Sequence, residues 1–86
     1  MTEDLNPMEI QIFTIPGCSY CVKLKRLLSR DNLTYIETVV DDTTLFKHQH
    51  PKCRGFPFSV IDGEEIGGIT ETAKFLLERG LVKRRG

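Results

Sequence analysis

IQIFTIPGCSYC, residues 10–21, is the stretch that decides the fold. Its first half is apolar and β-branched, which predicts a buried strand that Pro16-Gly17 breaks. Downstream of Cys21, the apolar residues Leu24, Leu27 and Leu28 recur at helical spacing, with lysines and arginines on the opposite side. The sequence therefore predicts two cysteines, three positions apart, where a strand meets an amphipathic helix.

Two cysteines at the start of a helix favour redox chemistry. Unpaired backbone N–H groups and the positive end of the helix dipole attract an anion, so Cys18 is expected to be the nucleophilic thiolate. Cys21 lies nearer the core, where a thiol keeps its proton until it attacks a mixed disulfide on Cys18, and it is expected to be the resolving thiol. A C-x-x-C pair also suits half of a zinc site or a structural disulfide, and the strand-to-helix context favours the redox interpretation.

Length and composition describe one small α/β domain over residues 1–86, with residues 1–8 as a loose lead-in. Twelve basic and twelve acidic residues give a net charge of zero, which argues against nucleic acid or acidic membranes as partners. The sequence has no run long enough to span a bilayer and no signal-peptide pattern, so a cytoplasmic location is the default expectation. A monomer is expected as well. Three cysteines argue against a secreted disulfide scaffold.

The remaining segments predict four further elements after the first strand and helix, and then a last helix. Residues 33–40 are rich in β-branched and aromatic residues and predict a second strand, parallel to the first. A polar cluster at 41–44 predicts a short helix that Pro51 ends. Asp62-Gly63 predicts a hairpin of two strands, and helical spacing from Ile69 to Gly80 predicts the last helix.

In its motifs and their order, the chain resembles the glutaredoxins of the thioredoxin-like superfamily from about Glu9 to Leu81. The motifs that carry the resemblance are Cys18-Ser19-Tyr20-Cys21, Phe56-Pro57, Asp62-Gly63, Gly67-Gly68 and Thr70-Glu71. The resemblance implies a thioredoxin-like α/β fold of order β-α-β-α-β-β-α, with a four-stranded mixed sheet flanked by three helices. It also implies a glutathione-dependent thiol–disulfide oxidoreductase that reduces protein disulfides and protein–glutathione mixed disulfides.

The resemblance further implies a glutathione site formed by Tyr20, Phe56, Pro57, Gly68, Ile69, Thr70 and Glu71. In the family the proline is cis and lies beside the nucleophilic sulfur, while the residue before it offers its backbone to the substrate. The glutamyl carboxylate of glutathione meets the start of the last helix, and the acid matching Glu71 faces the glutamyl ammonium. Without the family, a trans strand-start proline and a glycine turn with no ligand are the favoured interpretations, and Thr70 and Glu71 suit a helix N-cap and a favourable first-turn charge.

Partners and cofactors follow from the same resemblance. Glutathione is the implied reductant, in a role in electron transport and cell redox homeostasis. The implied clients are disulfide-containing or glutathionylated proteins, with ribonucleotide reductase as a family target. Some members with Cys-Ser-Tyr-Cys hold a [2Fe–2S] cluster between two monomers, so Ser19 permits such a cluster here, while no tightly bound cofactor is expected.

One departure from the family pattern concerns the electron donor. Ile15 stands where many glutaredoxins carry a Lys or Arg that meets the glycyl carboxylate of glutathione. Lys47, Lys52 and Arg54 are candidates to replace that charge, or are ordinary surface charges. The alternative function is therefore a redoxin reduced by thioredoxin reductase that serves ribonucleotide reductase.

Two rival classes complete the sequence hypotheses. Cys18, Cys21, His50 and Cys53 form a ligand set that zinc accepts, with His48 as a spare donor. A thioredoxin-like interaction module without catalysis is the other rival. Cys53 is interpreted either as a small buried apolar residue or as an exposed thiol open to glutathionylation.

Overall fold

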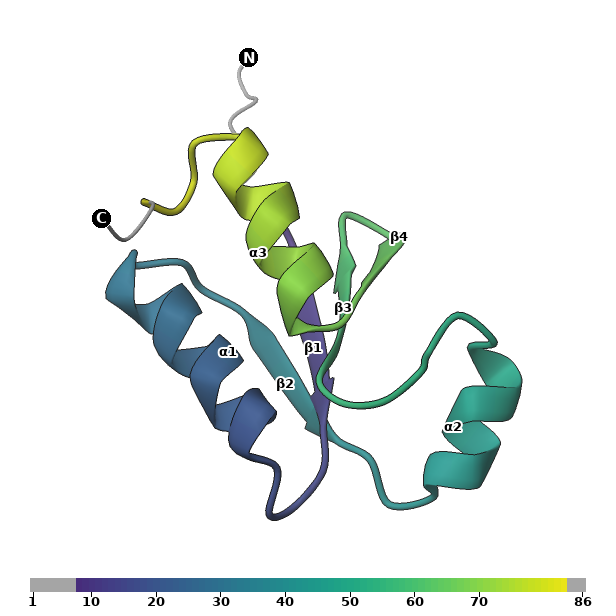
Figure 1. Ribbon diagram of the computed structural model, residues 1–86. Coiled ribbons are helices and arrows are strands. Elements are labelled where there is room, and N and C mark those ends of the chain that lie inside the picture. The colour runs from purple at the N-terminus through teal and green to yellow at the C-terminus, as the bar shows by residue number, and fades with distance from the viewer. Residues whose placement is uncertain (1–7, 84–86) are drawn as a thin grey trace.

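The computed structural model describes residues 8–83, so the expected lead-in over residues 1–8 lies outside it except for Met8. Seven elements follow one another along the chain (Figure 1). They are β1 (Ile10–Thr14), α1 (Ser19–Arg30), β2 (Ile36–Val39), α2 (Thr43–Gln49), β3 (Phe58–Ile61), β4 (Glu64–Gly67) and α3 (Ile69–Glu78). This order is the predicted β-α-β-α-β-β-α.

The four strands form one mixed sheet in the order β2-β1-β3-β4. β1 pairs in parallel with β2 and antiparallel with β3, and β3 pairs antiparallel with β4. β2 is shorter than predicted, because the chain around Asn32 forms the C-terminal cap of helix α1. Asn32 adopts a positive φ of 59°, and the Leu33 N–H donates to the Leu28 carbonyl at 2.9 Å. Residues 33–35 are therefore a helix-terminating loop, and the strand begins at Ile36.

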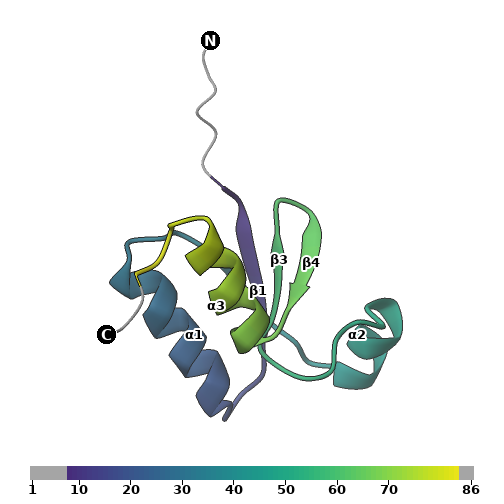
Figure 2. The same cartoon turned by 45° about the horizontal axis from the view of Figure 1, so that its top comes forward.

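Each face of the sheet has its own apolar cluster, because side chains alternate along β1. Ile12 points to the face covered by α1 and α3, where it packs with the fully buried Leu24, Leu28 and Leu76. Phe13 points to the other face, towards Phe46 of α2 and Phe58 of β3. Figures 1 and 2 show α1 and α3 side by side, with α2 standing apart from them.

The hairpin between β3 and β4 has the turn that its sequence predicts. Asp62 and Gly63 both have positive φ, 51° and 82°, which is the backbone of a type I′ turn and matches the twist of the two strands. The Asp62 backbone and carboxylate also bind the backbone of Glu9 at 2.9 Å. The turn therefore also fixes the start of β1.

A buried polar pair that the sequence did not indicate joins α3 to the sheet. Thr72 of α3 and Ser59 of β3 are both fully buried, and their hydroxyl oxygens lie 2.5 Å apart. The Thr72 hydroxyl also lies 2.7 Å from the carbonyl of Gly68, just before α3. Because unpaired buried polar groups are costly, this pair fixes the position of the Gly67-Gly68 turn.

Replacing Thr72 by Val should lower the free energy of unfolding by about 1–3 kcal/mol, because Ser59 and Gly68 lose a buried partner. Urea denaturation measures the change. Thr44→Val, at an exposed position of α2, is the matched control and should stay within about 0.5 kcal/mol. An equal loss of unfolding free energy in the two variants would show that the buried pair contributes no more to stability than an exposed threonine.

Candidate active site at the start of helix α1

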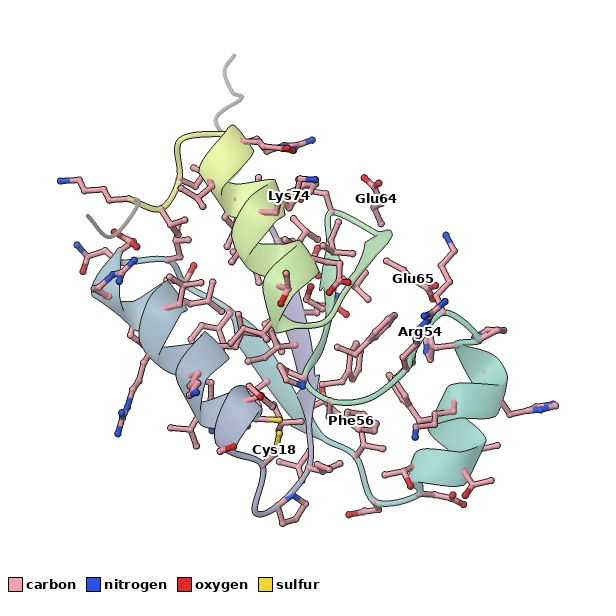
Figure 3. The ribbon with its side chains drawn as sticks, viewed as in Figure 1. Cys18, Arg54, Phe56, Glu64, Glu65 and Lys74 are labelled. Atoms are coloured by element: carbon pink, nitrogen blue, oxygen red, sulfur yellow. The ribbon has the colours of Figure 1, made fainter. Side chains whose placement is uncertain are left out.

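Cys18 is the N-cap of α1, held there by the turn that follows β1. Gly17 adopts a φ of 71°, and Cys18 itself is extended, with φ −99° and ψ 110°. Its sulfur accepts a hydrogen bond from the backbone N–H of Cys21 at 3.1 Å. The same sulfur lies 3.5 Å from the carbonyl oxygen of Phe56, to which the thiol donates, and Figure 3 shows the two residues near each other. The half-buried sulfur therefore meets a donor that suits a thiolate and an acceptor that suits a thiol.

Cys21 lies in the first turn of α1 and is buried, with 3% of its surface exposed. Burial, and after it the hydrogen bond with Cys18, raise the pKa of the Cys21 thiol to about 11. A hydrogen bond with the Ile15 backbone and the positive charge of Lys25 oppose this rise only partly. Cys21 is therefore a protonated thiol at neutral pH, as the sequence predicted.

A polar network beside the cysteines was missed by the sequence analysis. The Glu37 carboxylate of β2 accepts from the Thr14 hydroxyl at 2.7 Å and pairs with Lys25 of α1 at 3.1 Å. The Thr14 hydrogen bond and then the Lys25 ion pair lower the pKa of Glu37, and the bond to Glu37 raises the pKa of Lys25. The sequence shows that Lys25 lies one helical turn after Cys21, which could have indicated a cation near the cysteines. It does not show Glu37 beside Lys25, because that contact depends on the parallel register of β1 and β2.

A groove of about 470 Å³ opens on the other side of the site. It is lined by every residue that the sequence analysis proposed for glutathione, namely Tyr20, Phe56, Pro57, Gly68, Ile69, Thr70 and Glu71. The Phe56–Pro57 peptide bond is cis, which confirms that expectation. Three distant segments of the chain therefore meet in one groove beside Cys18, although Cys18 is not itself among the lining residues.

The Gly67-Gly68 turn is shaped by its contact with Glu71. Gly67 adopts a φ of 128°, and a Cβ placed on it would lie 3.2 Å from the Glu71 Cβ, so the position favours glycine strongly. The Glu71 carboxylate accepts from the Gly68 N–H at 3.2 Å. Glu71 therefore helps to cap α3, which agrees with its alternative interpretation as an acid at the helix start. It also lines the groove.

Two cations and one acid lie at the opposite end of the groove. Lys52, Arg54 and Glu65 line it, whereas Lys47 does not. Figure 3 shows Arg54 on the loop that leads to Phe56, with Glu65 close by on β4. Ile15, at the position that is often basic, is half-buried and packs against the aromatic cluster on the α2 side of the sheet.

The four ligands of the zinc hypothesis do not come together. His50 Nδ1 lies 2.7 Å from the Glu65 carboxylate, and its ring packs on Phe46 at a centroid distance of 4.4 Å. Cys53 is buried, 5% exposed, and its thiol donates to the Gly55 carbonyl at 3.3 Å. Within residues 8–83 no three His, Cys, Asp or Glu side chains form a group that could hold a metal ion. Cys53 matches its interpretation as a small buried apolar residue.

Comparison with known proteins gives the same family from sequence and from structure. The glutaredoxin family model matches residues 10–66. Glutaredoxin 1 of Rickettsia bellii is 33% identical in an alignment of 69 positions that covers 72% of this chain and 70% of that protein. The crystal structure of glutaredoxin 1 from Francisella tularensis, complexed with cacodylate, superposes with a TM-score of 0.72 at 33% identity, covering 86% of this chain and 96% of that one.

One matching protein is much longer than this chain. The hybrid peroxiredoxin hyPrx5 of Haemophilus influenzae is 35% identical in an alignment of 68 positions that covers 77% of this chain but only 28% of that protein. The similarity therefore concerns a part of hyPrx5. Among the described residues, no helix has the length and apolar character needed to cross a bilayer.

A cysteine pair at a helix start beside a cis-proline, in a thioredoxin-like fold, defines a class of protein, the thiol–disulfide oxidoreductases. The chain belongs to the glutaredoxin family within that class.

The raised pKa of Cys21 predicts a pH effect on stability. A thiol whose pKa is higher in the folded state supports folding fully below pH 9, and this support is lost as the pH rises from 9 to 11. In reducing buffer, the difference in unfolding free energy between wild type and Cys21→Ala should therefore narrow over that interval. The difference between wild type and Val22→Ala, an exposed neighbour, should not change. A constant difference for Cys21→Ala would contradict the raised pKa.

Proposed function

We propose that this protein is a glutathione-dependent glutaredoxin, which reduces protein–glutathione mixed disulfides and protein disulfides. The observation that carries the proposal is the groove beside Cys18, because its shape and charges suit glutathione from end to end. The groove has two cations, with Glu65 beside them, at one end and the start of a helix at the other. Glutathione carries a carboxylate at each of its ends, and both features suit an anion.

In the proposed reaction Cys18 attacks the glutathione sulfur of a mixed disulfide. The N–H of Cys21 stabilises the attacking thiolate through its 3.1 Å hydrogen bond to the sulfur. In the resting thiol, the Phe56 carbonyl accepts from Cys18. Once the sulfur is bonded to glutathione this donor is gone, and the same carbonyl is free to accept the N–H of the glutathione cysteine.

The two ends of glutathione are assigned by charge. Lys52 and Arg54 face the glycyl carboxylate. These two side chains supply the positive charge that Ile15 cannot. The backbone at Ile69 and Thr70, in the first turn of α3, binds the glutamyl carboxylate with the help of the helix dipole. Glu71 faces the glutamyl ammonium from its position as the helix cap.

Cys21 completes the dithiol reaction in this proposal. When a client protein is joined to Cys18, Cys21 loses its proton as it attacks the Cys18 sulfur, which releases the reduced client and leaves a Cys18–Cys21 disulfide. Two glutathione molecules then restore both thiols and form glutathione disulfide. The proposal places the protein in the cytoplasm as a monomer, with glutathionylated or disulfide-containing proteins, ribonucleotide reductase among them, as clients.

Serine substitutions separate the two thiols. Cys18→Ser should abolish both the reduction of a glutathionylated peptide and the reduction of a protein disulfide, because the nucleophile is lost. Cys21→Ser should abolish only the second activity and keep much of the first, which needs one thiol. Glutathione reductase coupled to NADPH oxidation measures both, and Cys53→Ala is the control with both activities retained. Loss of every activity in Cys21→Ser would show that the roles are assigned wrongly.

Removing the cations of the groove should weaken glutathione binding. Lys52→Gln and Arg54→Gln should each raise the KM for glutathione about three- to tenfold, because each removes one charge that faces the carboxylate. Lys47→Gln, a lysine of α2 that does not line the groove, is the matched control. If all three variants behave alike, the carboxylate is bound elsewhere.

The second candidate function is a redoxin reduced by thioredoxin reductase, and the observation in its favour is Ile15 at an often basic position. One mixed-disulfide substrate and two reductant systems distinguish the candidates. Turnover with glutathione and glutathione reductase, and little with thioredoxin reductase, is the expected result. Turnover only with thioredoxin reductase would replace the proposed function by the second one.

A further inference from the structure

Helix α1 carries a charge imbalance that the proposed reaction does not use. Its sequence contains four cations and no acid, although the whole chain has a net charge of zero. Lys25 pairs with Glu37, and Arg30 pairs with Asp31 at 3.2 Å. Within residues 8–83, no carboxylate lies within 4.0 Å of the charged groups of Lys23 and Arg26. Two exposed cations of this helix are therefore available to a partner.

These cations border a hollow between α1 and α3, which we call the basic groove. It measures about 580 Å³ and is lined by Lys23, Arg26, Leu27, Arg30, Ile69 and Ala73. The three cations are exposed, and the three apolar residues are half-buried. None of the six is acidic. The basic groove therefore combines an apolar surface with one sign of charge.

The basic groove continues directly from the glutathione groove. Ile69 lines both of them. Tyr20, which lines the glutathione groove, lies under the Lys23 ammonium at 5.1 Å from the ring centre. A polypeptide whose cysteine is joined to Cys18, or to a glutathione bound beside Cys18, can therefore pass across Tyr20 and enter the basic groove without crossing another element.

We propose that the basic groove binds the client polypeptide, and that it selects clients whose reactive cysteine is flanked by acidic residues and an apolar residue. This inference rests on the proposed function, because it names the protein substrates of the same site. Acidic side chains complement Lys23 and Arg26, and Arg30, which also pairs with Asp31, adds positive charge at the far end of the groove. An apolar side chain covers Leu27, Ile69 and Ala73. A nucleic acid suits the groove less well, because its backbone offers nothing for the half-buried apolar residues and the protein has no overall positive charge.

Helix geometry gives the position of the acidic residues in the client. Along an α-helix the rise is 1.5 Å per residue, so Lys23 lies roughly 8 Å and Arg30 roughly 18 Å beyond Cys18. An extended chain advances about 3.3 Å per residue. The acidic residues should therefore stand about two to six positions from the reactive cysteine.

The reaction itself is the one proposed above. The Cys18 thiolate bonds to the glutathione sulfur, the bond between that sulfur and the client cysteine breaks, and the client leaves as a thiolate that takes a proton from water. A second glutathione thiolate then attacks the Cys18–glutathione disulfide and forms glutathione disulfide, which frees Cys18. The basic groove changes the affinity for the client and takes no part in these bond changes.

The test compares three substrates reduced by wild type with glutathione. They are a glutathionylated peptide with Asp and Leu two to six positions from its cysteine, the same peptide with Lys in place of Asp, and 2-hydroxyethyl disulfide, which has no polypeptide. The KM for the acidic peptide should be about three- to tenfold below that for the basic peptide at low salt, and the difference should shrink as salt is added. Equal KM values for the two peptides would overturn the inference.

Arg26→Glu should raise the KM for the acidic peptide about three- to tenfold and leave the turnover of 2-hydroxyethyl disulfide unchanged. Lys47→Glu, on α2, makes the same change in net charge away from the groove and should change neither value. An equal rise in KM for Lys47→Glu would mean that overall charge and not the groove selects the client. Inhibition of the acidic-peptide reaction by single-stranded DNA, stronger than by a thiol-free acidic peptide, would also overturn the inference.

The same measurements separate this inference from the proposed function. If wild type reduces 2-hydroxyethyl disulfide with glutathione but does not distinguish the peptides, only the inference about the basic groove fails. If wild type reduces none of the three substrates with glutathione, the proposed function fails first.

Discussion

The hydrogen bond from the Cys21 N–H to the Cys18 sulfur is the interaction on which the site depends. It exists only because a turn at Gly17 follows β1 and makes the next residue, Cys18, the N-cap of α1, so that a sulfur takes the place of the usual N-cap oxygen. The core holds this junction rigid, since Leu24 and Leu28 of the same helix are fully buried against the sheet. The packing of the whole domain thus sets the position of one reactive atom.

The two cysteines need opposite environments, and the structure provides both within one helical turn. Cys18 is half-buried and reachable, while Cys21, three residues later, is buried and keeps its proton. The groove proposed to bind glutathione contains the cis Phe56–Pro57 bond and the start of α3, and its glycine turn is fixed by the buried Ser59–Thr72 pair. A hydroxyl pair in the core therefore supports the shape of a surface groove.

The sequence predicted the parts of this arrangement that depend on local chemistry. The cysteine spacing, the Asp62-Gly63 turn and the helical periodicities each require particular residues within a few positions, and all three are found in the structure. Contacts set by strand register were not predictable, and Lys25 with Glu37 is the clearest of them. The predicted length of β2 was wrong. The β-branched composition of residues 33–40 did not reveal that Asn32 and Leu33 form the C-terminal turn of the preceding helix. The groove residues were named from the family resemblance, and folding was needed to bring them together.

A brief treatment of the reduced protein with substoichiometric iodoacetamide at neutral pH tests the central claim most directly, with mass spectrometry locating the label. The account predicts that nearly all of the label is on Cys18, because its sulfur is half-buried and accepts the Cys21 N–H. Cys21 and Cys53 are buried and should stay almost unlabelled. Label distributed equally among the three cysteines, or found first on Cys21 or Cys53, would contradict the account.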